Sequence, residues 1–260
     1  MWGHLLDNQC RYLREHAPHF HANRRVNNKV AVIVEPRRHA YLEHVVRNVM
    51  YHLGPQWNLE IITYEKNIDF IESSFPGCTL RVVGLPFPNM NQTLYNHLLM
   101  DPWFWWHLRE EHVLIFQTDC IMFRGGVDDW LEYDYVGANY FHPQHMSPKY
   151  GGVQGGFSLR RRSCMLECLD KVSWKSIQYF RSHHQRSPLN CFHEDVFFTH
   201  ACNILDKQVP GIDKRKQFAI EAEFYETPIG HHGTTKSYFT DEQIARIISR
   251  CANRAMWSLP

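Results

Sequence analysis

Short apolar strands alternate with helices through the first 120 residues, and this order constrains the fold of the chain more than any other feature. Apolar, β-branched runs predict four strands, at residues 29–34, 57–64, 79–85 and 113–117. Apolar residues at helical spacing predict intervening helices, at residues 40–53, 67–74 and 91–100. Alternation of this kind favours βαβ units and a parallel sheet. We therefore expect a Rossmann-like half whose ligands bind at the carboxyl ends of the strands.

The second half of the chain has fewer strand signals and contains a glycine-rich segment at residues 151–156. The expected elements follow in this order: a strand at 133–138, a strand at 157–160, helices at 162–171 and 194–203, a strand at 218–224, a turn at 230–233 and a terminal helix at 241–254. No long linker divides the chain. We expect an N-terminal arm over residues 1–28 and a single domain over residues 29–260.

The charge balance bears on the partners of the protein. Lys and Arg number 28 against 27 Asp and Glu, a formal net charge of +1, so no global field attracts nucleic acid or an anionic membrane. We expect no nucleic-acid partner, because a basic stripe is missing. We also expect no membrane span, because no window approaches 18–20 apolar residues. Without a visible targeting segment the expectation is a soluble, cytoplasmic protein, with the Golgi or ER lumen as the alternative if a leader preceded this sequence.

The eight cysteines are expected to be mostly reduced and buried, with a disulfide framework as the minority interpretation. None forms a CxxC pair, and the spacing typical of zinc sites is absent. Cys164 and Cys168 lie four residues apart on a predicted helix. The aromatic cluster at residues 103–106 is expected to pack in the core rather than stack on a sugar.

One carboxylate stands where a parallel sheet presents its ligands. Asp119 comes directly after the strand predicted at residues 113–117. A single Asp there can hold Mg²⁺ or Mn²⁺, which prefer oxygen ligands and often share them with phosphates. The alternative is an Asp that closes a turn after a strand.

Three further segments are candidates for chemistry, and each also has a purely structural interpretation. Gly155 and Gly156 would let the backbone approach a ligand, or would belong to a flexible hairpin. Glu194 and Asp195 open a predicted helix, where they would supply a general base or favour the helix dipole. A histidine pair in the turn at residues 230–233 would bind a metal or phosphate, or lie on an exposed turn.

The order of these segments is more specific than any one of them, and in this order the chain resembles the GT-A glycosyltransferases, which use nucleotide sugars. More closely, it is similar to a family of glycosyltransferase-like domains of eukaryotic microbes, fungi and large DNA viruses that is named only as a domain of unknown function. The segments that carry the resemblance lie within residues 29–235: they are 113–120, 134–138, 155–160, 194–198 and the late Gly-His. The resemblance implies an α/β GT-A (Rossmann-like) fold with a mixed, mostly parallel central sheet flanked by helices.

The resemblance also implies roles for residues at the sheet. Asp119 corresponds to the metal- and diphosphate-binding carboxylate of the DxD motif, with Thr118 beside it in the cofactor site. Gln117 replaces the first Asp of that motif, so the metal would be held weakly or be dispensable. Gly155 and Gly156 match the glycines that approach the donor and acceptor sugars.

The acidic pair and the late histidine receive roles in the same way. Asp195, preceded by Glu194, matches the catalytic base of inverting members. His232, or alternatively His231, matches the histidine that completes the metal or diphosphate site.

The nucleotide is expected near the end of the first strand. Val34, Glu35 and Arg37 lie where such folds receive the base and ribose. Arg37 and Arg160 are candidates to pair with phosphate, since a guanidinium group can make bidentate contacts.

The function that these features imply is the transfer of a sugar from a nucleoside-diphosphate sugar, with a UDP-sugar favoured, to a hydroxyl of a glycan or glycoprotein acceptor. The cofactor would be Mn²⁺ or Mg²⁺. Residues 29–120 would form the nucleotide-sugar half, 121–240 the acceptor half and 241–260 a C-terminal helix. One alternative is a catalytically inactive nucleotide- or sugar-binding module, which the missing first Asp favours. A metal-dependent phosphohydrolase is less well supported, because such sites need several convergent carboxylates and histidines.

Overall fold

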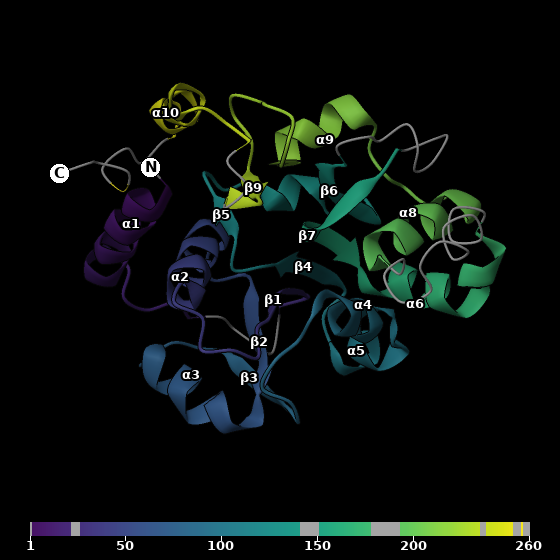
Figure 1. Ribbon diagram of the computed structural model, residues 1–260, viewed down its shortest axis with the longest axis horizontal. Helices are drawn as coiled ribbons and strands as arrows, with labels where there is room; N and C mark the ends of the chain where they lie inside the picture. Colours follow the sequence, from purple (N-terminus) through teal and green to yellow (C-terminus); the bar gives the residue numbers. More distant parts are fainter. Residues whose placement is uncertain are drawn as a thin grey trace.

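A six-stranded sheet in the order β3-β2-β1-β4-β7-β6 forms the centre of the computed structural model, which describes residues 2–21, 27–140, 151–177, 193–234, 238–251 and 256 (Figure 1). Its strands are β1 (Lys29–Val34), β2 (Asn58–Tyr64), β3 (Arg81–Leu85), β4 (His112–Phe116), β6 (Tyr135–Asn139) and β7 (Val153–Arg161). The first four strands along the chain run parallel, and β7 is antiparallel to both β4 and β6. The predicted α/β fold with a mixed, mostly parallel sheet is confirmed.

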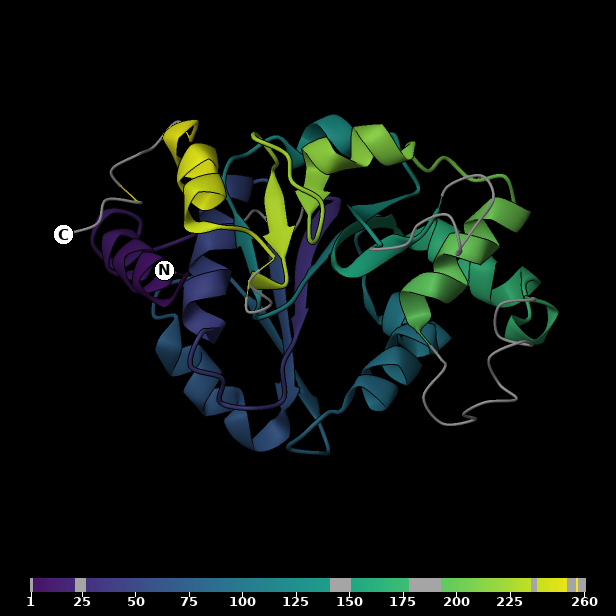
Figure 2. The same ribbon diagram turned by 45° about the horizontal axis from the view of Figure 1, so that its top comes forward.

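Helices cover both faces of this sheet (Figures 1 and 2). On one face lie α2 (Leu42–Leu53) and α3 (Ile68–Ser74), and on the other α4 (Gln92–Met100), α5 (Pro102–His107), α6 (Arg162–Lys171) and α8 (Glu194–Ile204). In β1, Ala31 and Ile33 pack with α2, while Val30 and Val32 pack in the opposite core cluster. Burial on both faces explains why this strand is a continuous apolar run.

A second, small sheet holds the region after β4 in place. It has the order β5-β9-β8, formed by β5 (Cys120–Met122), β9 (Gly230–His232) and β8 (Ala219–Ile220), which follows α9 (Ile212–Phe218). A third core cluster joins this sheet to the N-terminal helix α1 (Trp2–His16) and to α10 (Asp241–Ser249) through Leu13, Ile121 and Ile244. The first and last helices therefore lie close together (Figures 1 and 2). Three short 3₁₀ segments complete the description: Glu65–Asn67, Val127–Trp130 and Trp174–Ser176.

Several predicted elements have different bounds. The turn expected at residues 230–233 is strand β9, because its backbone pairs with β5 on one side and β8 on the other. The strand expected at 218–224 shrinks to β8, since α9 continues to Phe218. The terminal helix ends at Ser249, and residues 252–254 of the predicted helix lie outside the described residues. The glycine-rich segment does not end before a strand: β7 begins at Val153, so that Gly155 and Gly156 are strand residues.

The aromatic cluster at 103–106 is a separate helix, because Asp101 has an extended backbone and caps α5 by accepting a hydrogen bond from the Trp103 backbone N–H. The prediction of core packing holds for Phe104 and Trp105, which are fully buried. It is wrong for Trp103 and Trp106, which are 43% and 69% exposed.

The described cysteines agree with the expectation that they are mostly reduced and buried. All seven described cysteines are free, and all except Cys78 are buried, while Cys191 lies outside the described residues. No described helix is both long enough and apolar enough to span a bilayer.

Candidate active site

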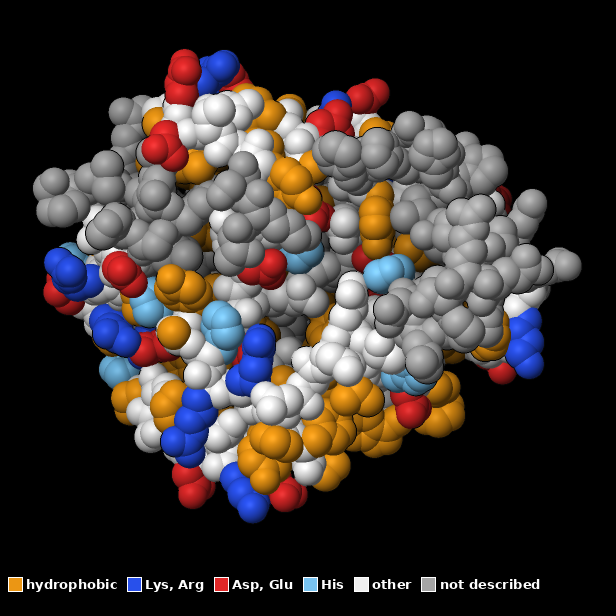
Figure 3. All heavy atoms as spheres, in the orientation of Figure 1, with side chains coloured by type: hydrophobic (Ala, Val, Ile, Leu, Met, Phe, Trp, Pro, Cys, Tyr) orange, Lys and Arg blue, Asp and Glu red, His pale blue; other side chains and the backbone are white. Residues whose placement is uncertain are grey.

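A cavity of about 680 Å³ opens where β1 and β4 end. Along the chain, the strand order runs outward from β1 to β3 and then returns to β4 on the other side of β1. This reversal leaves a crevice beyond the carboxyl ends of the two adjacent strands, which is where open α/β sheets bind ligands. Figure 3 shows histidine and acidic side chains near the middle of this surface.

The segment after β1 forms one wall of the cavity. Val34, Glu35 and Arg37 all line it. Glu35 is 4% exposed, and its carboxylate accepts two hydrogen bonds of 2.7 Å from the Arg37 guanidinium and one of 3.0 Å from the Arg37 backbone N–H. Arg37 nevertheless stays 54% exposed. The positive charge of Arg37 is thus oriented at the cavity but already partly balanced by Glu35.

The segment after β4 forms the floor of the cavity, with Gln117, Thr118 and Asp119 among its lining residues. The carbonyl oxygen of Asp119 accepts hydrogen bonds of 3.0 Å from the backbone N–H groups of Gly233 and Thr234. These two bonds attach the end of β9 directly to the candidate metal ligand.

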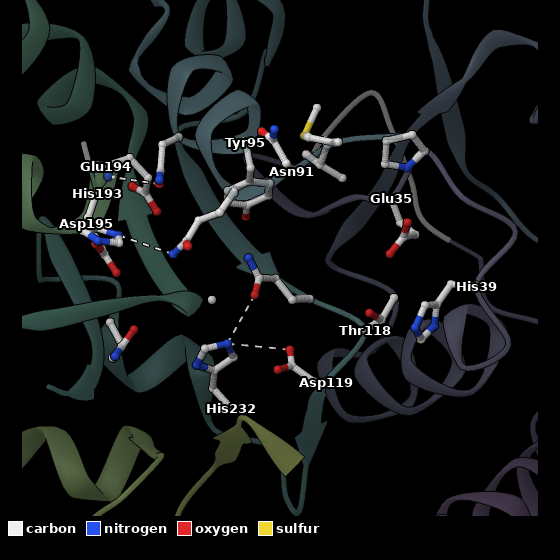
Figure 4. A pocket seen from close by; sticks show the side chains of 18 of the residues that line it. Glu35, His39, Asn91, Tyr95, Thr118, Asp119, His193, Glu194, Asp195 and His232 are labelled. Atoms are coloured by element: carbon white, nitrogen blue, oxygen red, sulfur yellow. Dashed lines mark hydrogen bonds and ion pairs between the residues drawn. The ribbon is translucent and has the colours of Figure 1, made fainter. Parts of the chain in front are cut away.

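His232 reaches the floor from β9, where it is the register partner of Cys120. Its Nε2 lies 3.2 Å from Gln117 Oε1 and 3.6 Å from Asp119 Oδ1 (Figure 4). Its Nδ1 lies 3.4 Å from Oε2 of Glu221, which is 5% exposed. Both ring nitrogens therefore face oxygen atoms, and on the cavity side two oxygens and a nitrogen converge.

The neighbouring His231 does not share this site. Adjacent residues of a strand point to opposite faces, and the His231 ring packs against Phe239, 5.2 Å between ring centroids. Of the two histidines considered from the sequence, His232 is the one that lines the cavity.

Gly155 and Gly156 make room for side chains rather than for unusual backbone angles. A Cβ atom on Gly156 would lie 2.2 Å from Nε2 of His232, and one on Gly155 would lie 2.3 Å from Oε1 of Glu194. Gly156 lines the cavity, whereas Gly155 is not among its lining residues. The glycines therefore let the imidazole and the acidic pair sit directly against β7.

Glu194 and Asp195 begin α8 on the opposite side of the cavity from Asp119 (Figure 4). Glu194 receives two hydrogen bonds from Arg160, of 2.5 and 2.9 Å, and Arg160 is fully buried behind it. The expectation that Arg160 binds phosphate is wrong, because its guanidinium has no exposed surface and is committed to Glu194. Arg160 is also a strand residue and not part of a solvated helix start.

The carboxylate of Asp195 accepts hydrogen bonds from neutral groups, whereas that of Glu194 accepts them from a charged arginine. The hydroxyl of Tyr140 donates to both carboxylate oxygens, at 3.0 and 3.1 Å, and the Gly155 backbone N–H donates to Oδ2 at 3.2 Å. Burial, reinforced by the charge of Glu194, raises the pKa of Asp195 to about 7. A carboxylate with this pKa can both take up and release a proton near neutral pH.

Sequence reasoning missed Tyr140, Asn91 and Tyr95, which line the cavity, and Glu221, which contacts His232 but is not a lining residue. Tyr140 and Glu221 follow β6 and β8, and no local motif marks either of them. Asn91 and Tyr95 come from the first turns of α4 and also line the cavity. Asn91 does carry a sequence signal, since it precedes a helix as an N-cap, and its side chain accepts a hydrogen bond from the Leu94 N–H.

The fold is that of the GT-A glycosyltransferases, and comparison with solved structures shows the similarity. Mouse xyloside xylosyltransferase 1, in its apo form, is 10% identical, with a TM-score of 0.53 over 85% of this chain and 100% of that one. The glycosyltransferase GlyE of Streptococcus pneumoniae TIGR4 gives a TM-score of 0.46 at 12% identity over 84% of this chain. The protein spans only 56% of the GlyE chain.

The chain belongs to the family described as "Protein of unknown function (DUF5672)", which it matches over residues 81–232. The matched region contains Asp119, Gly156, the acidic pair and, at its last position, His232. It leaves out Val34, Glu35 and Arg37 at the first strand. No curated protein matches the sequence.

Proposed function

We propose that this protein is a metal-dependent glycosyltransferase that moves a sugar from a nucleoside-diphosphate sugar, a UDP-sugar in the favoured case, to a hydroxyl group of a glycan or glycoprotein. The observation that carries the proposal is that a candidate metal-binding group and a candidate general base lie on opposite sides of one cavity. Asp119, Gln117 and His232 converge on one side, and Asp195 lies on the other. Residues 29–120 would hold the nucleotide sugar and 121–240 the acceptor.

The charges of the cavity support a requirement for a cation. Four described carboxylates line it, on Glu35, Asp119, Glu194 and Asp195, whereas Arg37 is the only described lining residue with a permanent positive charge. Glu35 is paired with Arg37, and Glu194 with Arg160. A diphosphate entering alone would therefore meet the carboxylate of Asp119 with no free permanent cation among the described lining residues, and would be repelled by it. A divalent cation bound with the nucleotide would reverse this repulsion.

The donor set on the floor fits Mn²⁺ or Mg²⁺. Two oxygens and an imidazole nitrogen suit such ions. Adjacent ligands of an octahedral ion with bonds of 2.0–2.1 Å lie about 3 Å apart, close to the separations of Nε2 from Gln117 and Asp119. Asp119, Gln117 and His232 would therefore hold the ion. The ion would supply positive charge to the diphosphate leaving group.

The remaining steps belong to the side chains. Asp195 would remove the proton from the acceptor hydroxyl as its oxygen forms a bond to the anomeric carbon. The bond from that carbon to the diphosphate oxygen breaks, and the diphosphate leaves with the electron pair. Attack from the face opposite the leaving group inverts the configuration. Tyr140 would orient the Asp195 carboxylate through its hydroxyl, and Arg160 would orient Glu194 beside it.

Calorimetric titration of the full chain with UDP and with GDP, each with and without Mn²⁺, tests the binding part of the proposal. Binding that requires Mn²⁺ and is lost in Asp119→Asn supports it. The exposed variant Asp213→Asn, whose side chain is 98% exposed, is the matched control. No binding of either nucleotide by the wild type would refute the proposal.

Release of nucleoside diphosphate from a panel of nucleotide sugars tests the catalytic part. Binding without turnover for every donor and acceptor would favour the inactive module, which the Gln117 replacement supports. Hydrolysis of phosphate esters without sugar transfer would favour a phosphohydrolase.

A further inference from the structure

A second group of potential metal ligands lies away from the cavity, between α6 and α8. Cys164 and Cys168 are one helical turn apart on α6, and Cys202 faces them from α8. Their sulfur atoms all lie within 4.8 Å of one another, and Sγ of Cys168 is 4.0 Å from Sγ of Cys202. The spacing of Cys164 and Cys168 did not reveal this group, because its third member comes from another helix.

The surroundings of the three thiols are apolar and dry. Cys164 is 3% exposed, and Cys168 and Cys202 have no exposed surface. They belong to the core cluster that packs α5, α6 and α8 against the sheet. Water therefore cannot serve as an additional ligand, and the coordination number would be set by the protein.

The geometry of the sulfurs fits a three-coordinate ion. Metal–sulfur bonds of about 2.3 Å place the sulfurs of a trigonal thiolate set about 4 Å apart, which matches the separation of Cys168 and Cys202. Structural zinc sites instead take four protein ligands. Among the described residues, no fourth Cys, His, Asp or Glu joins the group. Soft thiolates without a fourth ligand favour Cu(I).

We propose that Cys164, Cys168 and Cys202 form a buried site for a single Cu(I) ion that joins α6 to α8. Each thiol loses its proton to solvent as its sulfur bonds to the ion, with no change in oxidation state. Because α8 begins with Glu194 and Asp195, occupancy of the site would also fix the helix that carries the acidic pair.

Transfer of Cu(I) to the reduced, metal-free full chain tests the proposal. The ion is supplied anaerobically as its bathocuproine disulfonate complex, and loss of the coloured complex measures the copper that the protein takes. We expect the wild type to take one equivalent, to develop copper–thiolate absorption in the ultraviolet, and to melt at a higher temperature. Failure of the wild type to remove copper from the chelator would overturn the proposal.

Single variants identify the ligands. Cys164→Ser, Cys168→Ser and Cys202→Ser should each lose the tightly held equivalent. Cys251→Ser is the matched control, since Cys251 is buried in a different cluster. Cys120→Ser is the second control, because Cys120 groups with Asp119 and His232 at the cavity. Retention of the copper in all three cluster variants, or its loss in Cys120→Ser, would contradict the assignment.

X-ray absorption of the copper-loaded wild type reads the ligands without any substitution, and so covers the case in which a cluster variant does not fold. A first shell of three sulfur atoms is the expected result. A mixed shell of sulfur and nitrogen would place the copper at Cys120 and His232 and would overturn the proposal.

Discussion

Gly156 and His232 lie in such close contact that a methyl group on the glycine would be 2.2 Å from the imidazole Nε2. The absence of a side chain at Gly156 in β7 thus leaves the space that the His232 ring occupies beside Asp119. We predict that Gly156→Ala displaces His232 and weakens Mn²⁺ binding, by about 10–100-fold if it acts as changes around metal ligands usually do. Calorimetry with Mn²⁺ and UDP measures the effect. Gly211→Ala is the control, since a methyl group there meets no atom within 4 Å, and equal losses in both variants would contradict the prediction.

Glu221 faces the other nitrogen of the His232 ring, Nδ1, and allows a second test of how this histidine is oriented. Its carboxylate lies 3.4 Å from Nδ1, so it can accept a hydrogen bond from the Nδ1–H group and leave Nε2 free to bind an ion. Glu221→Leu should weaken Mn²⁺ binding by about 10–100-fold, while Glu221→Gln, which keeps an oxygen acceptor, should retain most of the affinity. Unchanged manganese affinity in a folded Glu221→Leu protein would remove the orienting role.

Asp195→Asn should separate turnover from binding. Loss of a general base lowers turnover by about 10²–10⁴-fold, whereas the affinity for the nucleotide should change little because Asp119 and His232 are intact. In the wild type, turnover should rise with pH through about 7, since the pKa of Asp195 is raised to about 7 and the base must be deprotonated. Initial rates with saturating donor measure both effects. A collapse of donor affinity in the variant would make Asp195 a binding residue.

The same raised pKa predicts a gain in stability for Asp195→Asn. Folded Asp195 keeps its proton up to about pH 7, while in the unfolded chain the carboxyl releases it near its ordinary value of 3.8. The folded wild type therefore loses stability as the pH rises from about 4 to 7, and the neutral asparagine does not. We expect the melting temperature of Asp195→Asn to exceed that of the wild type at pH 8 and to approach it at pH 4. The opposite order at pH 8 would show that the carboxylate is stabilised by its neighbours.

Removal of one member of the Arg160–Glu194 pair should be costly. Glu194→Gln leaves the fully buried guanidinium of Arg160 without its counter-charge, and such changes cost about 3–5 kcal/mol. Urea unfolding measures the loss. Lys171→Ala, which breaks an exposed ion pair with Glu167, is the control and should shift the midpoint little. A small effect of Glu194→Gln would indicate that water reaches Arg160.

The parallel part of the fold could be predicted because β1, β2 and β4 are apolar runs that are almost completely buried, while the edge strand β3 is only partly buried. Asp119 could be placed at the crevice for the same reason: position after a central strand is a local property. What could not be predicted depends on pairing between distant segments. Gly230–His232 pairs with Cys120–Met122 as a strand, but in isolation two histidines between glycines are typical of a turn.

The partners of charged side chains also could not be predicted from neighbouring residues in the sequence. Arg160 stands in a run of three arginines, which usually marks an exposed segment, yet the alternation of strand β7 turns it into the core toward Glu194. Glu221 and Tyr140 follow short strands whose neighbours are known only from the folded sheet.

The pairing of β5 with β9 also has a consequence for biosynthesis. Cys120–Met122 cannot find its partner until Gly230–His232 has left the ribosome, although β1 to β4 are complete more than a hundred residues earlier. In a nascent chain, the strands that border the crevice would therefore be complete before His232, whose imidazole faces Asp119, had been synthesised. Competence to capture a cation beside that aspartate would arise only in the final stage of cotranslational folding.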